Sequence, residues 1–148
     1  MKHLLLVFLL ISSPTLAMHH SSGDEQVIFL LDLNIIEDQS NNVDDLIKRL
    51  VSNVKATEPD TLIYNYYSNE DGSDIFLYEV YKNHAAAEFH VDQFMQSDFM
   101  PEFVATFEVE SFEVLGTTTD QLRQKMIDFT DDHRSCLLYT SPSPRDRG

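Results

Sequence analysis

Three side chains capable of acid–base chemistry stand close together in the sequence: Glu79, Tyr81 and His90. Imidazole titrates near neutral pH, so His90 could serve as a general base that deprotonates a phenol. Glu79 could orient that imidazole, or exchange protons itself if a pocket removed it from water and raised its pKa. Tyr81 shares the strand face of Glu79 and could hydrogen-bond a carbonyl or phenol oxygen. These three residues form the candidate catalytic group.

The sequence leaves a structural interpretation open for the two strongest candidates. His90 could be a core histidine with one satisfied hydrogen bond, because Ala86 and Phe94 share its helix face. Glu79 could serve a cross-strand hydrogen bond or a dimer contact. Neither interpretation requires a reaction.

A substrate ring would need walls and polar contacts near this group. Leu77 lies on the strand face of Glu79, and Phe94 follows His90 by one helical turn, so both could sandwich a ring. Asn65 on the neighbouring strand, and Asp32 or Asn34 on the first strand, could complete a polar pocket. We expect these five residues to bind substrate.

Composition excludes several other classes of site. The formal net charge of -15 argues against nucleic acid and anionic membrane surfaces as partners, because both would repel the chain. The sequence contains no metal-ligand set, phosphate loop or nucleophile elbow, and its four glycines form no dinucleotide-binding motif. We therefore expect no metal site.

Hydrophobic periodicity and turn residues divide the middle of the chain into strands and helices. Asp71-Gly72 is a strong turn signal between two aromatic-rich strands, Asn83 caps the helix that carries His90, and Asn41 or Asn42 can cap the first helix. The expected elements are a strand over residues 26–36, a helix over 43–55, strands over 61–68 and 74–81, a helix over 84–96, a short turn or helical piece over 97–103 interrupted by Pro101, a strand over 105–115 and a last helix to about 129.

The order β-α-β-β-α-β with an added C-terminal helix is the ferredoxin-like plan, an α+β fold with an antiparallel sheet covered by helices on one face. We expect the open face to be half apolar: Ile28 and Leu30 stand beside Asp32 and Asn34, and the third strand offers Leu77 and Tyr81 beside Glu79. A face of this kind is typical of an interface or a pocket rather than of a solvated surface. The sequence therefore predicts a homodimer in which two sheets form a dimeric α+β barrel.

The two ends are expected to lie outside this domain. Residues 1–17 have the basic start, short apolar run and small-residue cleavage site of a signal peptide, which predicts a secreted or exported protein. Residues 18–25 are interpreted as a linker and residues 26–130 as the domain. Residues 131–148 are expected to be a disordered tail, of which 136–148 resemble an appended artefactual sequence. No other segment is long and apolar enough to span a membrane.

Several motifs resemble the antibiotic biosynthesis monooxygenase (ABM) domain family. They are Glu58-Pro59-Asp60-Thr61-Leu62 before a strand, Tyr78-Glu79-Val80-Tyr81 closing the next strand, and Ala86-x-x-x-His90 on the helix. Asp60 stands where the family usually has glycine. The likeness covers about residues 26–129, and its ending is similar to a branch of quinol monooxygenase-like proteins.

The resemblance implies a dimeric barrel whose members include oxygenases that act on phenolic or quinol-like aromatics without metal or flavin. It therefore implies no cofactor, with a small aromatic or quinol and molecular oxygen as partners. Haem degradation is disfavoured, because that branch uses a Trp that this chain lacks and Tyr81 occupies its place. Two alternatives remain: a non-catalytic barrel that binds a small ligand, and an isomerase on the same scaffold.

Overall fold

A computed structural model describes residues 26–36 and 42–135. The expected signal peptide, the linker, Asn41 and residues 136–148 lie outside the described residues. Along the described chain the elements are β1 (Val27–Ile35), α1 (Val43–Thr57), β2 (Thr61–Ser68), β3 (Asp74–Tyr81), α2 (His84–Gln96), α3 (Phe99–Thr106), β4 (Phe107–Gly116), α4 (Asp120–Met126) and β5 (His133–Arg134).

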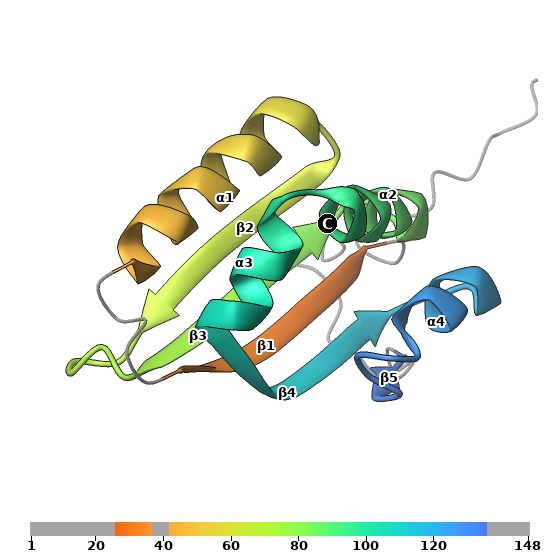
Figure 1. Ribbon diagram of the computed structural model, residues 1–148. Helices are drawn as coiled ribbons and strands as arrows, with labels where there is room; N and C mark the ends of the chain where they lie inside the picture. The colour runs from red at the N-terminus through yellow and green to blue at the C-terminus, as the bar shows by residue number, and fades with distance from the viewer. Residues whose placement is uncertain (1–25, 37–41, 136–148) are drawn as a thin grey trace, which may run out of the picture.

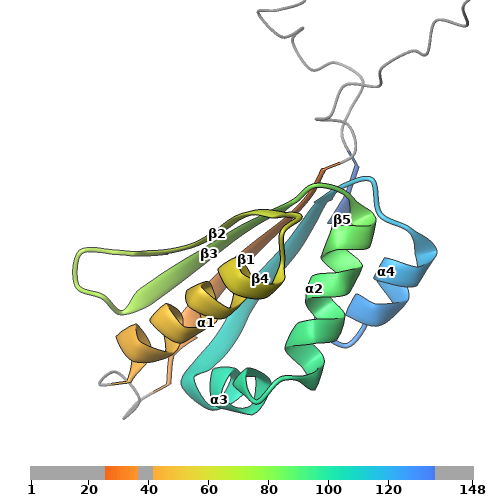
Figure 2. The ribbon, with the colours of Figure 1, turned by 90° about the horizontal axis from the view of Figure 1, so that it is seen from above.

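One sheet organises the molecule, with the strand order β2-β3-β1-β4-β5. The pairs β1/β3, β1/β4 and β2/β3 are antiparallel, and only the short pair β4/β5 is parallel. The helices lie together on one side of the sheet, as Figures 1 and 2 show. This arrangement confirms the predicted ferredoxin-like α+β fold.

The helix-covered face of the sheet holds the core. Alternation in β1 sends Val27, Phe29 and Leu31 toward the helices, where all three are buried. The register pairs Phe29 with Glu79, so Glu79 and its i±2 neighbours Leu77 and Tyr81 lie on this same covered face. The expectation that these three belong to the open face is therefore wrong.

The opposite face carries no described helix. Ile28, Leu30, Asp32 and Asn34 lie there as predicted, and the register sets them opposite Val80, Tyr78, Phe76 and Asp74 of β3. This face is thus half apolar, as predicted. Its β3 residues are the even-numbered ones rather than the predicted Leu77, Glu79 and Tyr81.

Several boundaries differ from the sequence prediction. Helix α1 ends at Thr57 rather than residue 55, and α4 ends at Met126 rather than about residue 129. Helix α3 runs through Pro101 to Thr106, because a proline in the first turn of a helix removes no needed N–H bond. The strand β4 consequently begins at Phe107 rather than residue 105. Residues 133–134 add β5 beside β4, so the described fold extends past the predicted end at residue 130.

Helix caps explain where two helices begin. The Asn83 side chain accepts a hydrogen bond from the Ala86 N–H at 3.0 Å, and the Thr119 hydroxyl accepts one from the Leu122 N–H at 3.1 Å. Asn42 occupies the N-cap position of α1 but makes no side-chain cap bond. Among the described residues, no helix has both the length and the apolar character needed to cross a membrane.

Candidate functional site

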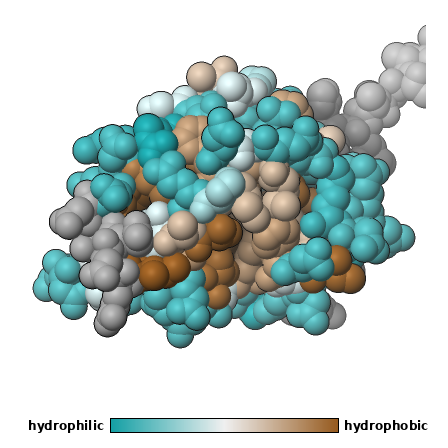
Figure 3. Space-filling model, in the orientation of Figure 1, coloured by the Kyte–Doolittle hydropathy of each residue, from teal (hydrophilic) through white to brown (hydrophobic). Residues whose placement is uncertain are grey.

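A cavity of about 320 Å³ lies between the sheet and the helices α2 and α3, with the end of α4 at its side. Its walls are mostly aromatic and methionine side chains, and its polar lining residues are Tyr64, Glu79, His90 and Asp128. The apolar walls include Phe29, Leu77, Phe94, Met100, Phe103, Phe112 and Met126. Figure 3 shows hydrophobic residues gathered in the middle of this side of the molecule, surrounded by hydrophilic ones.

His90 projects from α2 toward the sheet and is 6% exposed. Its ring stacks on Phe94 with a centroid separation of 6.2 Å and packs against Tyr81 at 5.2 Å. The Asn83 cap starts α2 so that the second turn carries His90 over β2 and β3. Its Nδ1 atom lies 2.8 Å from Oε2 of Glu58, which fixes the ring from the side away from the cavity.

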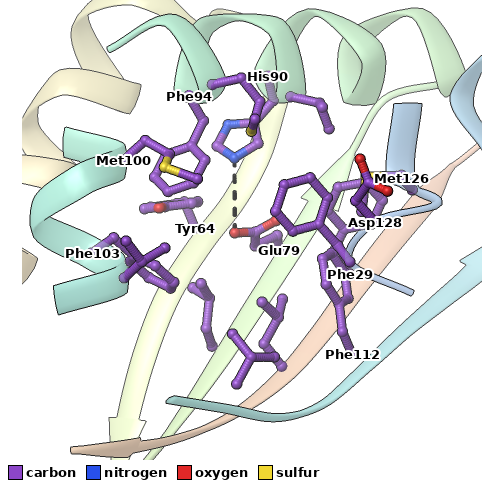
Figure 4. A pocket seen from close by; sticks show the side chains of 17 residues that line it. Phe29, Tyr64, Glu79, His90, Phe94, Met100, Phe103, Phe112, Met126 and Asp128 are labelled. Carbon is purple, nitrogen blue, oxygen red and sulfur yellow. Dashed lines mark ion pairs between the residues drawn. The ribbon is translucent and has the colours of Figure 1, made fainter. Parts of the chain in front are cut away.

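Glu79 reaches the cavity from the middle of β3 and is 3% exposed. Its Oε2 atom accepts a hydrogen bond of 2.5 Å from the Tyr81 hydroxyl, while Oε1 lies 3.9 Å from His90 Nε2 (Figure 4). Burial raises the pKa of Glu79, because a desolvated carboxylate is less stable than the neutral acid, and the nearby His90 and Tyr81 oppose that rise.

Burial alone would lower the pKa of His90, because it disfavours the imidazolium. The negative charges of Glu79 and Glu58 outweigh that effect together, so the pKa of His90 is raised above its ordinary value. The two carboxylates beside His90 therefore favour the protonated form of its ring.

Glu58 is the functional candidate that sequence reasoning missed. It follows the last residue of α1, is 4% exposed, and accepts a hydrogen bond from the Thr61 hydroxyl at 2.8 Å besides its contact with His90. It does not line the cavity. The sequence contained one signal for it, since Glu58 opens the family-like motif, but nothing local pairs it with a histidine 32 positions away.

Tyr64 also lines the cavity without having been singled out. Its hydroxyl lies 3.0 Å from that of Tyr66, and its ring centroid is 5.5 Å from that of His90. Burial raises the pKa of Tyr64 well above its ordinary value, so this phenol stays neutral in the folded protein.

The structure brings together five of the eight predicted site residues. His90, Glu79, Leu77 and Phe94 line the cavity, and Tyr81 lies directly behind Glu79 without lining it. Asp32, Asn34 and Asn65 do not join them. The register sets Asn65 opposite Tyr78 and Asp32 opposite Phe76, so these side chains lie on the other face of the sheet, and their predicted place in this pocket is wrong.

Within the described part of the chain, no three His, Cys, Asp or Glu side chains gather as a metal site. His90 lies between Glu58 and Glu79, with Nδ1 2.8 Å from Glu58 Oε2 and Nε2 3.9 Å from Glu79 Oε1.

No family profile matches the chain, and no curated protein matches it significantly. Several solved structures, however, have a similar fold. MupZ from Pseudomonas fluorescens superposes with a TM-score of 0.68 at 18% identity, covering 82% of this chain and 97% of MupZ. SnoaB, a cofactor-independent oxygenase from Streptomyces nogalater, gives 0.54 at 11% identity, covering 64% and 95%.

A Bacteroides thetaiotaomicron protein named, by inference, an antibiotic biosynthesis monooxygenase gives a TM-score of 0.54 at 14% identity, covering 68% of this chain and 93% of that protein. These likenesses rest on shape, since the sequences are far apart. The chain has the fold of the ABM-type proteins.

Proposed function

We propose that this protein is a cofactor-independent monooxygenase that oxidises a small, uncharged hydroxylated aromatic compound such as a quinol. The observation that carries the proposal is a mostly apolar cavity into which Glu79 and His90 face together. A flat ring fits walls of Phe and Met side chains, and one hydroxyl group fits beside Glu79 and His90.

The charged residues that line the cavity limit the charge that a substrate can carry. The cavity lining includes two carboxylates, Glu79 and Asp128, and among the described residues no Lys or Arg lines it. A ligand carboxylate or phosphate would meet repulsion from both, and the ring of His90 already lies between Glu58 and Glu79. The proposed substrate is therefore neutral before it loses its hydroxyl proton.

The proposed reaction begins when that hydroxyl loses its proton to the Glu79/His90 pair, because a phenolate gives up electrons to oxygen far more easily than a phenol does. For a hydroquinone, one O2 accepts four electrons. One oxygen atom forms the new C–O bond of a hydroxyquinone and the other leaves as water. The fold shared with SnoaB, which is named a cofactor-independent oxygenase, supports the proposal.

Oxygen uptake with a panel of hydroquinones, one of them carboxylated, tests this function. We expect uptake with neutral members and a loss of about 10²-fold or more in rate for His90→Ala, since general acid–base groups contribute on that scale. His84→Ala is the matched control, because His84 is exposed on the same helix and outside the cavity.

Other outcomes would replace the proposal. Ligand binding without oxygen uptake would favour a small-ligand binding protein. Product formation without oxygen would favour an isomerase. Equal uptake by wild type and His90→Ala would remove His90 from the mechanism.

We also propose that the enzyme acts as a homodimer after export, with the open sheet faces of two copies packed together. The face offers Ile28, Leu30, Phe76 and Tyr78 as apolar contacts, and Phe76 is 37% exposed. A signal peptide in residues 1–17 would direct export, and N-terminal sequencing of the secreted protein checks its removal.

Sedimentation velocity tests the dimer. We expect wild type to sediment as a dimer and Phe76→Asp to shift toward monomer, because each copy would bury an unpaired carboxylate in the interface. Ile127→Asp is the control, since Ile127 is 60% exposed beyond α4 and away from the open face. A wild-type monomer at all concentrations would contradict the prediction.

A further inference from the structure

One ring nitrogen of His90 makes a hydrogen bond to Glu58, and the other faces the cavity. Its Nδ1 atom meets Glu58 Oε2 at 2.8 Å, which is a hydrogen-bond distance. With a carboxylate as its only acceptor there, Nδ1 must carry a proton. The remaining atom, Nε2, faces the cavity and Glu79.

Burial and a hydrogen bond fix the side chain of Glu58, so it can in turn fix the orientation of the His90 ring. Its side chain is 2% exposed, and the Thr61 hydroxyl donates to the same Oε2 atom at 2.8 Å. Because Glu58 lies behind His90 and does not line the cavity, it touches neither the ligand space nor Glu79's free oxygen.

His90 and Glu79 lie close enough for one oxygen atom, placed beside the line that joins them, to contact both. Nε2 and Oε1 are 3.9 Å apart, too far for a direct hydrogen bond. A hydroxyl oxygen placed about 2.7 Å from each atom would bridge them, accepting a hydrogen bond from one and donating its proton to the other. Glu79 Oε2 is already engaged by Tyr81, which leaves Oε1 for this contact.

We propose that Glu58 is a positioning residue that keeps His90 as an imidazolium, so that Glu79, not His90, takes the hydroxyl proton of the substrate. The inference rests on the proposed function and assigns the roles within it. The proton moves from the substrate oxygen to Glu79 Oε1, and the electron pair stays on the oxygen as a phenolate. The Nε2–H of His90 donates to that phenolate and stabilises its charge.

The groups that face His90 agree with this assignment. They are Glu58 from the turn after α1, Tyr64 from β2, and Glu79 and Tyr81 from β3. Asp128, in the segment after α4, lines the same cavity. All are acidic or neutral, and none is a cation. The surroundings therefore favour the protonated ring, with two carboxylates in direct reach.

NMR of the full chain tests the charge state without any substrate. We expect both ring nitrogens of His90 to be protonated at neutral pH and the Glu79 carboxyl carbon to show the ionised form. Glu58→Gln should move the His90 midpoint to lower pH, because the amide keeps the acceptor and removes the charge. Asp60→Asn is the control, because it removes an exposed carboxylate two residues after Glu58. It should leave the His90 midpoint unchanged.

The pH profile of turnover tests the roles. In Glu58→Gln we expect the alkaline limb to move to lower pH and the acidic limb to move less, because Glu58 has the smallest of the influences on the pKa of Glu79. We expect kcat to fall about 10-fold and KM to change less than about 2-fold. Glu58→Asp, which restores the charge, should return the alkaline limb toward the wild-type position.

Two results would overturn the assignment. An unprotonated Nε2 in wild type at neutral pH would make His90 the base, and that measurement stands even if Glu58→Gln fails to fold. Movement of the acidic limb alone would lead to the same conclusion. Absence of oxygen uptake would contradict the proposed function, and the NMR result would still decide whether Glu58 holds the imidazolium.

Discussion

A Glu79→Gln variant is expected to lose about 10²- to 10⁴-fold in kcat and to keep its fold, because the amide matches the carboxylate in shape but cannot accept the proton. Its carbonyl oxygen can still accept the Tyr81 hydroxyl, which lies 2.5 Å from Glu79 Oε2 in the native protein. Oxygen uptake measures the loss of rate, and the melting temperature measures the fold.

The same variant should change how stability depends on pH. The folded pKa of Glu79 is raised by burial above its unfolded value. A raised carboxyl pKa means that folding favours the protonated form, so stability falls as pH rises from the unfolded pKa through the folded one. Glutamine carries no titrating proton, and the variant should lack this decline.

Glu108→Gln is the matched control for both measurements, since Glu108 is an exposed carboxylate on β4 and does not line the cavity. It should keep the wild-type rate and the wild-type pH dependence. A Glu79→Gln enzyme with native kcat would show that the proton leaves to another group and would reduce Glu79 to a structural role.

Local sequence signals were sufficient for most of the fold. The bounds of β2, β3 and α2 match the prediction, because an Asp71-Gly72 turn and an Asn83 cap mark them within a few residues. The boundary between α3 and β4 was predicted wrongly. Pro101 was interpreted as a break, although it lies in the first turn of α3.

Face assignment was harder than element assignment. Alternation in β3 separates Leu77, Glu79 and Tyr81 from Phe76, Tyr78 and Val80, but it does not say which set meets the helices. The register with β1 decides that question, because Phe29 and Glu79 are partners on the core face. A buried glutamate on an apolar face runs against ordinary patterning, which is why the open face was the natural first interpretation.

The candidate site shows the same division between local and distant information. His90 and Glu79 could be picked from residue type, since few titratable groups stand among aromatics in this chain. Glu58 could not, because its partner is set by how α2 packs over β2 and β3. Asp32, Asn34 and Asn65 were polar residues on correctly predicted strands, but they point to the wrong side of the sheet.

Replacing Gly116 with alanine is expected to be the most destabilising small substitution in the described fold. Gly116 ends β4 opposite Val27, with φ of +108°, and an added Cβ would lie 2.2 Å from the backbone oxygen of Gln26. Both partners are backbone, so no side chain can move aside. We expect a loss of roughly 3–5 kcal/mol from combined strain and overlap.

Gly72→Ala separates the two causes. Gly72 also has a positive φ, +74°, but nothing lies within 4 Å of its added Cβ, so only backbone strain applies. Its cost should be about 1 kcal/mol, or roughly 4 °C in melting temperature, against about 12 °C or more for Gly116→Ala. Equal melting temperatures for the two variants would contradict this prediction. They would mean that the backbone at Gln26 moves aside at no cost, so that the overlap with the added Cβ at residue 116 does not destabilise the fold.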